Sequence, residues 1–301
     1  MTAFETILES AVRLSIPLVL VAMGEWAANR AGTVNLSLEG MMLAGAFGGA
    51  AGSEMAGSAM PGLVLGIAAG VAVALVQAEM SHRLAANQFV VGVTLNILVA
   101  GLTTFLFVTL ATDTVQAGVW TIPLLSDIPA VGTAFFQLRW PAYLAYVLVP
   151  AIAWLVYRSR WGLELRSVGE DAAAADLSGI PVNRRRRQSI LLAGAMAGLG
   201  GAVFSVGVVG AFQQNMTAGR GFIAIAAVVF GGWTVRGVVA GCVLFGGADA
   251  LRLALPALGV AVNSQMLIAA PYVLALVAMM FFARRVRPPA DLGVAFRQVR
   301  G

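Results

Sequence analysis

Long apolar runs separated by short polar breaks make up most of the chain. A helix needs about 20 apolar residues to cross the hydrocarbon core of a bilayer. Runs of this kind predict spans at 8–28, 37–56, 61–80, 89–110, 141–157, 189–211, 221–235, 237–255 and 264–283. Several runs are short or rich in glycine, so some are expected to be broken or re-entrant. The pattern predicts an all-α polytopic membrane protein, residues 1–301 forming a single transmembrane domain of about eight to ten transmembrane or re-entrant helices.

Composition supports this class and excludes several others. The chain is 59% hydrophobic and 11% charged, whereas soluble domains carry about 25% charged residues. All 19 basic residues are arginine, so the lysine of a P-loop is missing and the chain is not expected to hydrolyse ATP by that route. The arginines lie beside spans, which does not favour nucleic-acid binding. Cys242 is the single cysteine, so neither an internal disulfide nor a metal cluster is expected.

Arginine residues gather at alternate ends of the predicted spans. Because positive charge is retained on the cytoplasmic side, these ends are predicted to face the cytoplasm. They are Arg30, His82–Arg83, 158–187, Arg236 and 284–300, whereas 53–60, 111–139, 213–218 and 256–263 are nearly free of arginine. The pattern predicts a cytoplasmic loop at 158–188, an external loop at 111–140 and a cytoplasmic tail at 284–301. The number of spans would place the N-terminus outside.

The longest polar stretch runs from Trp161 to Ser189 and is too charged to cross lipid. Gly169 and Gly179 frame a segment of high helix propensity, with Glu170 and Asp171 in its expected first turn. We interpret it as a short helix shaped to fit a groove of another protein; the alternative is a solvated loop. The arginine run at 184–187 is assigned to membrane orientation and phospholipid contact.

Polar residues also lie where a cytoplasmic turn enters the second predicted span. Asn35 is suited to cap this helix, and Glu39 would follow in its first turn. The alternative is that both line a translocation path or hold a gate, with Glu25 in the same cluster. In the fourth span, Thr94 and Asn96 either bond between helices or line such a path.

Three further features are local. Within 217–233, glycines at 219, 221, 231 and 232 flank a short apolar run, which is expected to form a broken or half-length helix. Asp249 and Arg252, three residues apart, are interpreted as a structural ion pair. Glycines four residues apart, at 45/49, 48/52, 66/70, 194/198 and 237/241, are expected to let helices pack closely.

Three stretches together resemble one known family. NRAGTVNLSLEGMMLAGAF (29–47) is similar to its N-terminal "ERxGxxNLxxEGxM" signature, with Asn29 where glutamate is common. LRSVGEDAAAADLSGIPVNRRR (165–186) resembles its cytoplasmic loop, and AGRGFIAIAAVVFGGW (218–233) its "GxGFxxIAxxxxGGw" segment. The family comprises permease subunits of bacterial ABC importers for ribose-type sugars, branched-chain amino acids and nucleosides. The sequences Glu-Gly-Met-Met and Gly-Gly-Trp within these stretches favour the nucleoside-type subgroup.

The resemblance implies a type II-like ABC importer permease in the bacterial inner (plasma) membrane, without an active site or cofactor. Its partners would be ABC ATPase subunits, a second permease (a paralogue or itself), an extracytoplasmic substrate-binding protein and the lipid bilayer. The loop helix would couple to the ATPases through Gly169, Glu170, Asp171, Ala174, Ala175 and Gly179. Nucleosides are the expected solutes, with simple sugars or branched-chain amino acids as alternatives.

Two other classes fit less well. An ion-coupled secondary carrier would need acidic groups deep in the membrane, and Glu25 and Glu39 are expected near cytoplasmic ends. A membrane enzyme would need clustered histidine, cysteine or aspartate. The single histidine, His82, is interpreted as solvated at the membrane interface.

Overall fold

The computed structural model describes residues 3–110, 114–123, 125–126, 128, 131–257, 273, 277 and 287–296. In this part of the chain the regular structure is helical apart from one short antiparallel hairpin. In chain order the elements are α1 (Ala3–Arg30), α2 (Leu38–Ala56), α3 (Ala59–His82), α4 (Gln88–Leu110), β1 (Val119–Thr121), α5 (Gly132–Phe136), β2 (Gln137–Arg139), η1 (Trp140–Ala142), α6 (Tyr143–Arg158), α7 (Arg160–Glu170), α8 (Ala172–Leu177), α9 (Val182–Ala202), the π-helix η2 (Val203–Val209), α10 (Arg220–Phe230) and α11 (Val235–Ala257).

Six helical stretches among the described residues are long and apolar enough to cross a membrane. They are Glu5–Arg30, Ala59–His82, Gln88–Leu110, Trp140–Arg158, Val182–Val209 and Val235–Leu255. The apolar helix α2 has 19 residues. α10 has 11 residues, so the half-length helix predicted within 217–233 is present. The predicted span at 264–283 lies almost wholly outside the described residues. The all-α polytopic membrane class is confirmed.

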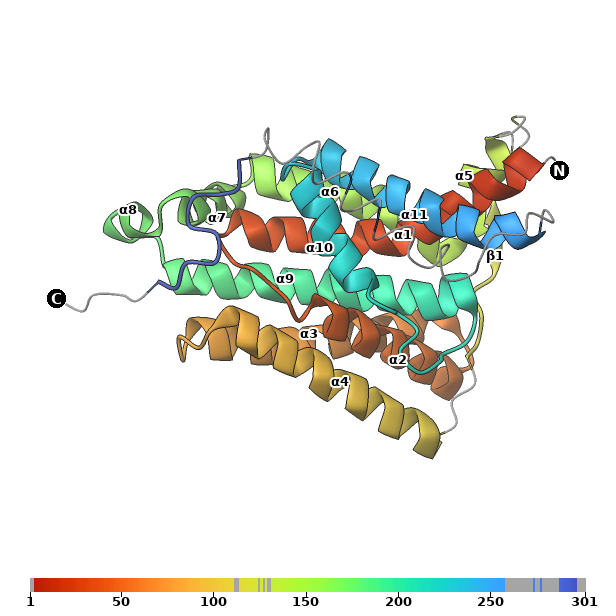
Figure 1. Cartoon of the computed structure of the whole chain (residues 1–301), viewed down its shortest axis with the longest axis horizontal. Coiled ribbons are helices and arrows are strands. Elements are labelled where there is room, and N and C mark those ends of the chain that lie inside the picture. The colour runs from red at the N-terminus through yellow and green to blue at the C-terminus, as the bar shows by residue number, and fades with distance from the viewer. Residues whose placement is uncertain are drawn as a thin grey trace.

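Two helices, α1 and α9, run side by side through the centre of the bundle (Figure 1). α2 and α3 pack against α9, α11 packs against α1, and α4 lies along the outside of α2. Most of α1 and α9 is buried, whereas about a third or less of α3, α4, α6 and α11 is buried and each of these helices exposes large apolar side chains. Apolar side chains on the outside of the bundle are stable when they contact lipid tails, so this distribution of buried and exposed residues is the one expected of a membrane protein.

Glycine allows α2, α3 and α9 to approach one another. A Cβ on Gly198 of α9 would overlap the Gly66 carbonyl oxygen and lie 3.1 Å from the Gly70 Cα, both on α3. On α2, a Cβ on Gly49 would lie 2.7 Å from the Ala202 Cα. These glycines therefore act in helix packing, as their spacing predicted.

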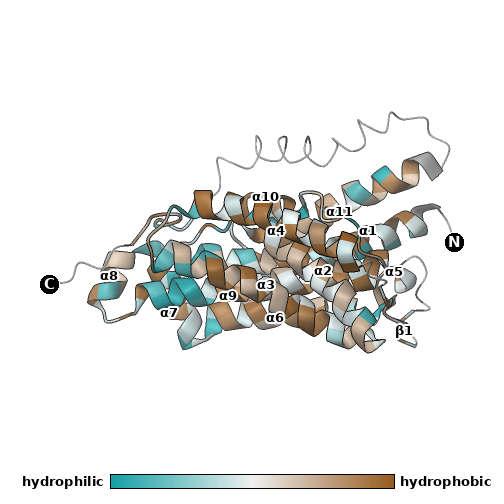
Figure 2. Ribbon diagram, turned by 90° about the horizontal axis from the view of Figure 1, so that it is seen from below, coloured by the Kyte–Doolittle hydropathy of each residue, from teal (hydrophilic) through white to brown (hydrophobic). Residues whose placement is uncertain are grey.

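The two ends of the bundle differ in polarity. One end, here called the α8 end, carries α7, α8, the last turn of α1 and residues 287–296 (Figure 1). The other, the β1 end, carries the start of α1, α5 and the hairpin, in which Val119 pairs with Arg139. Hydrophilic residues gather at the α8 end, chiefly in α7 (Figure 2). α1 begins at the end opposite α8.

Candidate functional site

The polar stretch 158–188 holds two successive helices, α7 and α8. Asp171 lies between them in extended backbone, with φ −154° and ψ 99°. It is the N-cap of α8, since its Oδ1 accepts a hydrogen bond from the Ala174 N–H at 2.8 Å. The predicted start of the short helix was therefore wrong. Glu170 belongs to α7, because Leu165, Val168 and Gly169 continue the buried face of that helix.

α8 has one buried and one exposed side. Ala172 and Ala175 pack with Val168 and Val182 in a small apolar cluster. On the other side lie small residues and Leu177, whose side chain is 91% exposed. Sequence reasoning missed Leu177, although it is the one large apolar residue between positions 170 and 179.

The structure divides the six predicted coupling residues into two groups. Four are exposed, namely Glu170, Asp171, Ala174 and Gly179, and two are buried, namely Gly169 and Ala175. A Cβ on Gly169 would overlap the carbonyl oxygen of Arg30, so this glycine lets α7 contact the end of α1. Exposed positions can meet a partner directly, whereas buried ones hold α8 in place.

Three of the four arginines at 184–187 bind other parts of the protein. Arg186 is fully buried, and it donates from Nε to the Ala31 carbonyl at 3.2 Å and from Nη1 to the Val294 carbonyl at 2.6 Å. The other two form ion pairs, Arg185 with Glu164 and Arg187 with Glu79. The assignment to phospholipid contact was wrong for buried Arg186, and the ion pairs of Arg185 and Arg187 give these two residues a structural role within the fold. Arg184 is exposed.

A buried polar cluster joins α1 to the connection that follows it. Oε1 of Glu25 accepts from Asn29 Nδ2 at 2.5 Å and from the Asn35 N–H at 3.4 Å. Asn29 Oδ1 accepts from Trp233 Nε1 at 3.1 Å. Glu25 therefore shares a cluster with Asn35, as predicted. Asn35 does not cap α2, because the N-cap is Ser37 and the Asn35 Oδ1 accepts from the Ser37 hydroxyl at 2.8 Å.

The other side of this connection is held by α3 and α4. The Val34 N–H donates to Gln88 Oε1 at 3.0 Å. The Thr33 hydroxyl lies 3.3 Å from Nε2 of His82, which is buried. The interpretation of His82 as solvated was therefore wrong. Residues 31–37 run inward from the α8 end, so that α2 begins near the middle of the bundle (Figure 1).

Glu39, in the first turn of α2, binds the start of α10. Its Oε1 accepts from the Thr217 hydroxyl at 2.6 Å and from the Gly219 N–H at 2.8 Å. Its Oε2 accepts from the Gly221 N–H at 2.6 Å. The carboxylate thus satisfies backbone donors at the positive end of a half-length helix. Its expected place near a cytoplasmic end was wrong, because residues 31–37 carry the start of α2 inward.

Asn96 of α4 binds backbone groups at the start of α2, as Glu39 does for α10. Its Oδ1 accepts from the Gly40 N–H at 2.7 Å, and its Nδ2 donates to the Leu36 carbonyl at 2.7 Å. Asn96 therefore bonds between helices, and Thr94 is exposed on the surface of α4, apart from this junction. α4 caps α2 through Asn96, and α2 caps α10 through Glu39. We call this arrangement the α2–α10 junction.

An ion-pair network lies beside the junction. Asp249 of α11 binds Arg220 at 2.6 Å and Arg252 at 2.9 Å. The predicted pair of Asp249 and Arg252 is present. Arg220, the first residue of α10, also lies 4.5 Å from the centre of the Phe204 ring. α10 is thus fixed at its start to α2, α11 and η2.

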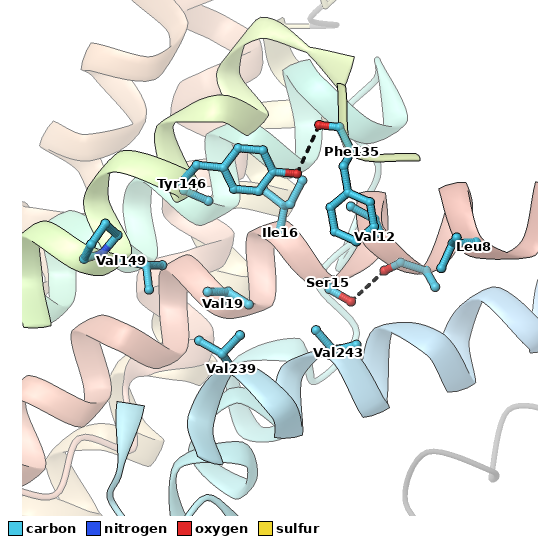
Figure 3. Close-up of a pocket in the computed structure, with 13 residues that line it drawn as sticks. Leu8, Val12, Ser15, Ile16, Val19, Phe135, Tyr146, Val149, Val239 and Val243 are labelled. Carbon is cyan, nitrogen blue, oxygen red and sulfur yellow. Dashed lines mark hydrogen bonds between the residues drawn. The ribbon is translucent and has the colours of Figure 1, made fainter. Parts of the chain in front are cut away.

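A groove of about 370 Å³ lies between α1, α6 and α11 (Figure 3). Its lining is almost wholly apolar. The Ser15 and Tyr146 hydroxyls turn to the backbone carbonyls of Ala11 and Phe135, at 2.6 Å and 3.3 Å. The groove suits an apolar occupant and has little to offer a polar solute.

The three sequence motifs lie in α8, the α2–α10 junction and the segments next to them, and comparison with known proteins identifies the family that shares them. The family described as "Branched-chain amino acid transport system / permease component" matches residues 7–283. The chain belongs to this family. The match covers α1 to α11, including α8 and the α2–α10 junction.

Three of the curated relatives of this permease are named for glucose, nucleoside or guanosine transport. It is 38% identical over 266 residues to a Haloferax volcanii protein named as a glucose ABC transporter permease, covering 85% of this chain and 80% of that one. It is 35% identical over 294 residues to the nucleoside ABC transporter permease NupC of Lactococcus lactis subsp. cremoris, covering 92% of each. It is 35% identical over 297 residues to the guanosine ABC transporter permease NupQ of Bacillus subtilis, covering 93% and 92%. The protein is a multi-pass ABC importer permease, a non-catalytic subunit.

Proposed function

We propose that this permease, with a second permease subunit, forms the pathway of an ABC importer for nucleosides. Its α8 would be the helix on which a pair of separate ATPase subunits acts. The observation that carries the proposal is α8 itself, a short helix at the polar end of the bundle. Its Leu177 is 91% exposed and so is accessible to a partner. An ATPase groove would receive the exposed side of this helix.

Contacts inside the chain provide a route from α8 to the bundle interior. Gly169, next to α8, packs on the end of α1. From there residues 31–37 lead to α2, whose Glu39 holds the start of α10. If the ATPases fit α8 differently in their two nucleotide states, they would bias the permease between two conformations. The pathway would open and close through relative movement of α2 and α10.

The coupling role can be tested with Leu177→Glu. A charged side chain in the ATPase groove should abolish ATP-driven uptake in proteoliposomes, while the permease still inserts in the membrane. Leu84→Glu is the matched control, since Leu84 is 66% exposed and follows α3 outside α8. Normal uptake by Leu177→Glu would refute the role of α8.

Nucleosides are favoured as solutes because NupC and NupQ align with the permease over almost its whole length. The external binding protein of such an importer sets much of its selectivity. Thermal unfolding of the binding protein that serves this importer should therefore be measured with guanosine, uridine, glucose and leucine. A rise in Tm with a nucleoside alone is the expected outcome.

Glucose or another simple sugar is the second candidate. It is favoured by the Haloferax volcanii relative, whose identity of 38% is slightly higher over a shorter alignment. A rise in the Tm of the binding protein with glucose and not with nucleosides would select this alternative.

The α8 end is proposed to face the cytoplasm of a bacterial inner membrane, and the β1 end to face outward. This is supported by the arginine distribution, since Arg30, Arg83 and 158–187 lie at the α8 end. An extracytoplasmic binding protein would then dock on the end that carries the hairpin and α5.

A further inference from the structure

Residues 287–296, here called the C-terminal strap, lie across the α8 end of the bundle (Figure 1). The family match ends at residue 283, so family membership assigns no role to this segment. Its backbone forms a turn, with the Leu292 N–H donating to the Pro289 carbonyl at 3.2 Å and the Val294 N–H to the Asp291 carbonyl at 3.2 Å. Its other contacts join three separate parts of the chain.

The first contact is at the break between α7 and α8. Oδ2 of Asp291 accepts from the Ala172 N–H at 2.7 Å. The Asp291 N–H donates to the Gly169 carbonyl at 3.0 Å. Asp291 therefore satisfies an acceptor in the last turn of α7 and a donor in the first turn of α8, on both sides of the extended residue Asp171.

The second contact is with the connection between α1 and α2. The Gly293 N–H donates to the Gly32 carbonyl at 2.9 Å. Buried Arg186 ties the same two segments together, because it donates to the carbonyls of both Ala31 and Val294. Gly293 has φ +79°, a conformation that costs residues with a Cβ and so favours glycine.

The third contact is apolar. Phe296 packs on the cluster formed by Val168, Ala172, Ala175 and Val182. This cluster includes the whole buried side of α8. The strap thus covers α8 from the side opposite its exposed face.

We propose that Asp291 is a positioning residue that makes α8 and the α1–α2 connection move as one body. The inference rests on the proposed coupling role of α8. α8 follows a single extended residue and has six residues of its own, so without the strap it could turn about Asp171 under load. With the strap in place, a displacement of α8 is passed through Gly32 to residues 31–37 and so to the α2–α10 junction.

The positional part of the proposal can be tested without partners. Amide hydrogen exchange of the detergent-solubilised full chain should rise about tenfold or more at 172–177 and at 31–37 in Asp291→Ala, because a charged hydrogen bond at the break is lost. Asp291→Asn keeps an oxygen that can accept from Ala172 and should exchange nearly as the parent does. Arg287→Ala removes an exposed charge in the same segment and serves as the control. Unchanged exchange in Asp291→Ala would overturn the proposal.

The functional part is measured in the assembled transporter as solute moved per ATP hydrolysed. Asp291→Ala should lower this ratio several-fold while ATP is still hydrolysed, and Asp291→Asn should restore most of it. A purely structural defect would lower uptake and assembly together and leave the ratio of the remaining complexes unchanged, which would count against the proposal. If the parent complex itself shows no coupled uptake, the proposed function fails, and the exchange measurement still decides whether the strap holds α8.

Discussion

The carboxylate of Glu39 accepts a hydrogen bond from the hydroxyl of Thr217 at 2.6 Å, although 178 positions separate the two residues. Two further donors, the N–H groups of Gly219 and Gly221, complete the site. Both α2 and α10 begin inside the bundle (Figure 1), where no neighbouring turn of the same helix can satisfy their first N–H groups. Side chains from other helices meet that need, as is required of irregular backbone at membrane depth.

Glu39→Ala is therefore expected to destabilise the permease strongly. It leaves one buried and one partly buried backbone N–H group and a buried hydroxyl without their acceptor, at a cost of roughly 3 kcal/mol or more. The Tm in detergent should fall by about 5 °C or more. Glu54→Ala, at an exposed position on the same helix, is the control and should leave the Tm within about 1 °C. An equal Tm for both variants would show that the junction contributes little.

The close approach of α3 and α9 leads to a second prediction. Gly198→Ala places a methyl group against the Gly66 carbonyl, and overpacking of this kind costs about 1–3 kcal/mol. Gly101→Ala is the matched control, because a Cβ there meets no atom within 4 Å and alanine favours the helix. Thermal unfolding should show a lower Tm for Gly198→Ala and an unchanged or higher Tm for Gly101→Ala. A neutral effect of Gly198→Ala would mean that the helices move apart readily.

The helices and the motifs could be predicted from the sequence because they depend on local pattern. Apolar length predicted the spans, and glycine spacing predicted the packing of α3 on α9. The partners of Glu39 could not be predicted, because Thr217 reaches it only through the way α2 and α10 enter the bundle. The contacts of Arg186 could not be predicted either, since an arginine beside a span is usually interpreted as orienting the protein in the membrane. In this chain Arg186 joins three segments that are distant in sequence.

Arg186 gives a third prediction. Lysine keeps the charge but cannot donate in two directions from a planar group. Arg186→Lys should therefore lose one of the bonds to the Ala31 and Val294 carbonyls, at about 1.5–3 kcal/mol. Arg184→Lys, at the exposed position of the same run, should change stability by about 0.5 kcal/mol at most. Urea unfolding in detergent compares the two, and equal midpoints would argue against a structural role for Arg186.

The orientation of the bundle gives the last prediction, which uses the single cysteine of the chain. Cys242 is fully buried, so the parent protein should react little with a membrane-impermeant maleimide. Val119→Cys lies in exposed β1, and Ser178→Cys lies in an exposed position directly after α8. In intact cells Val119→Cys should be labelled, whereas Ser178→Cys should be labelled only after the membrane is opened, because the arginine-rich end is expected to stay in the cytoplasm. The reverse pattern would place α8 outside, where no ATPase could reach it, and would rule out coupling through this helix.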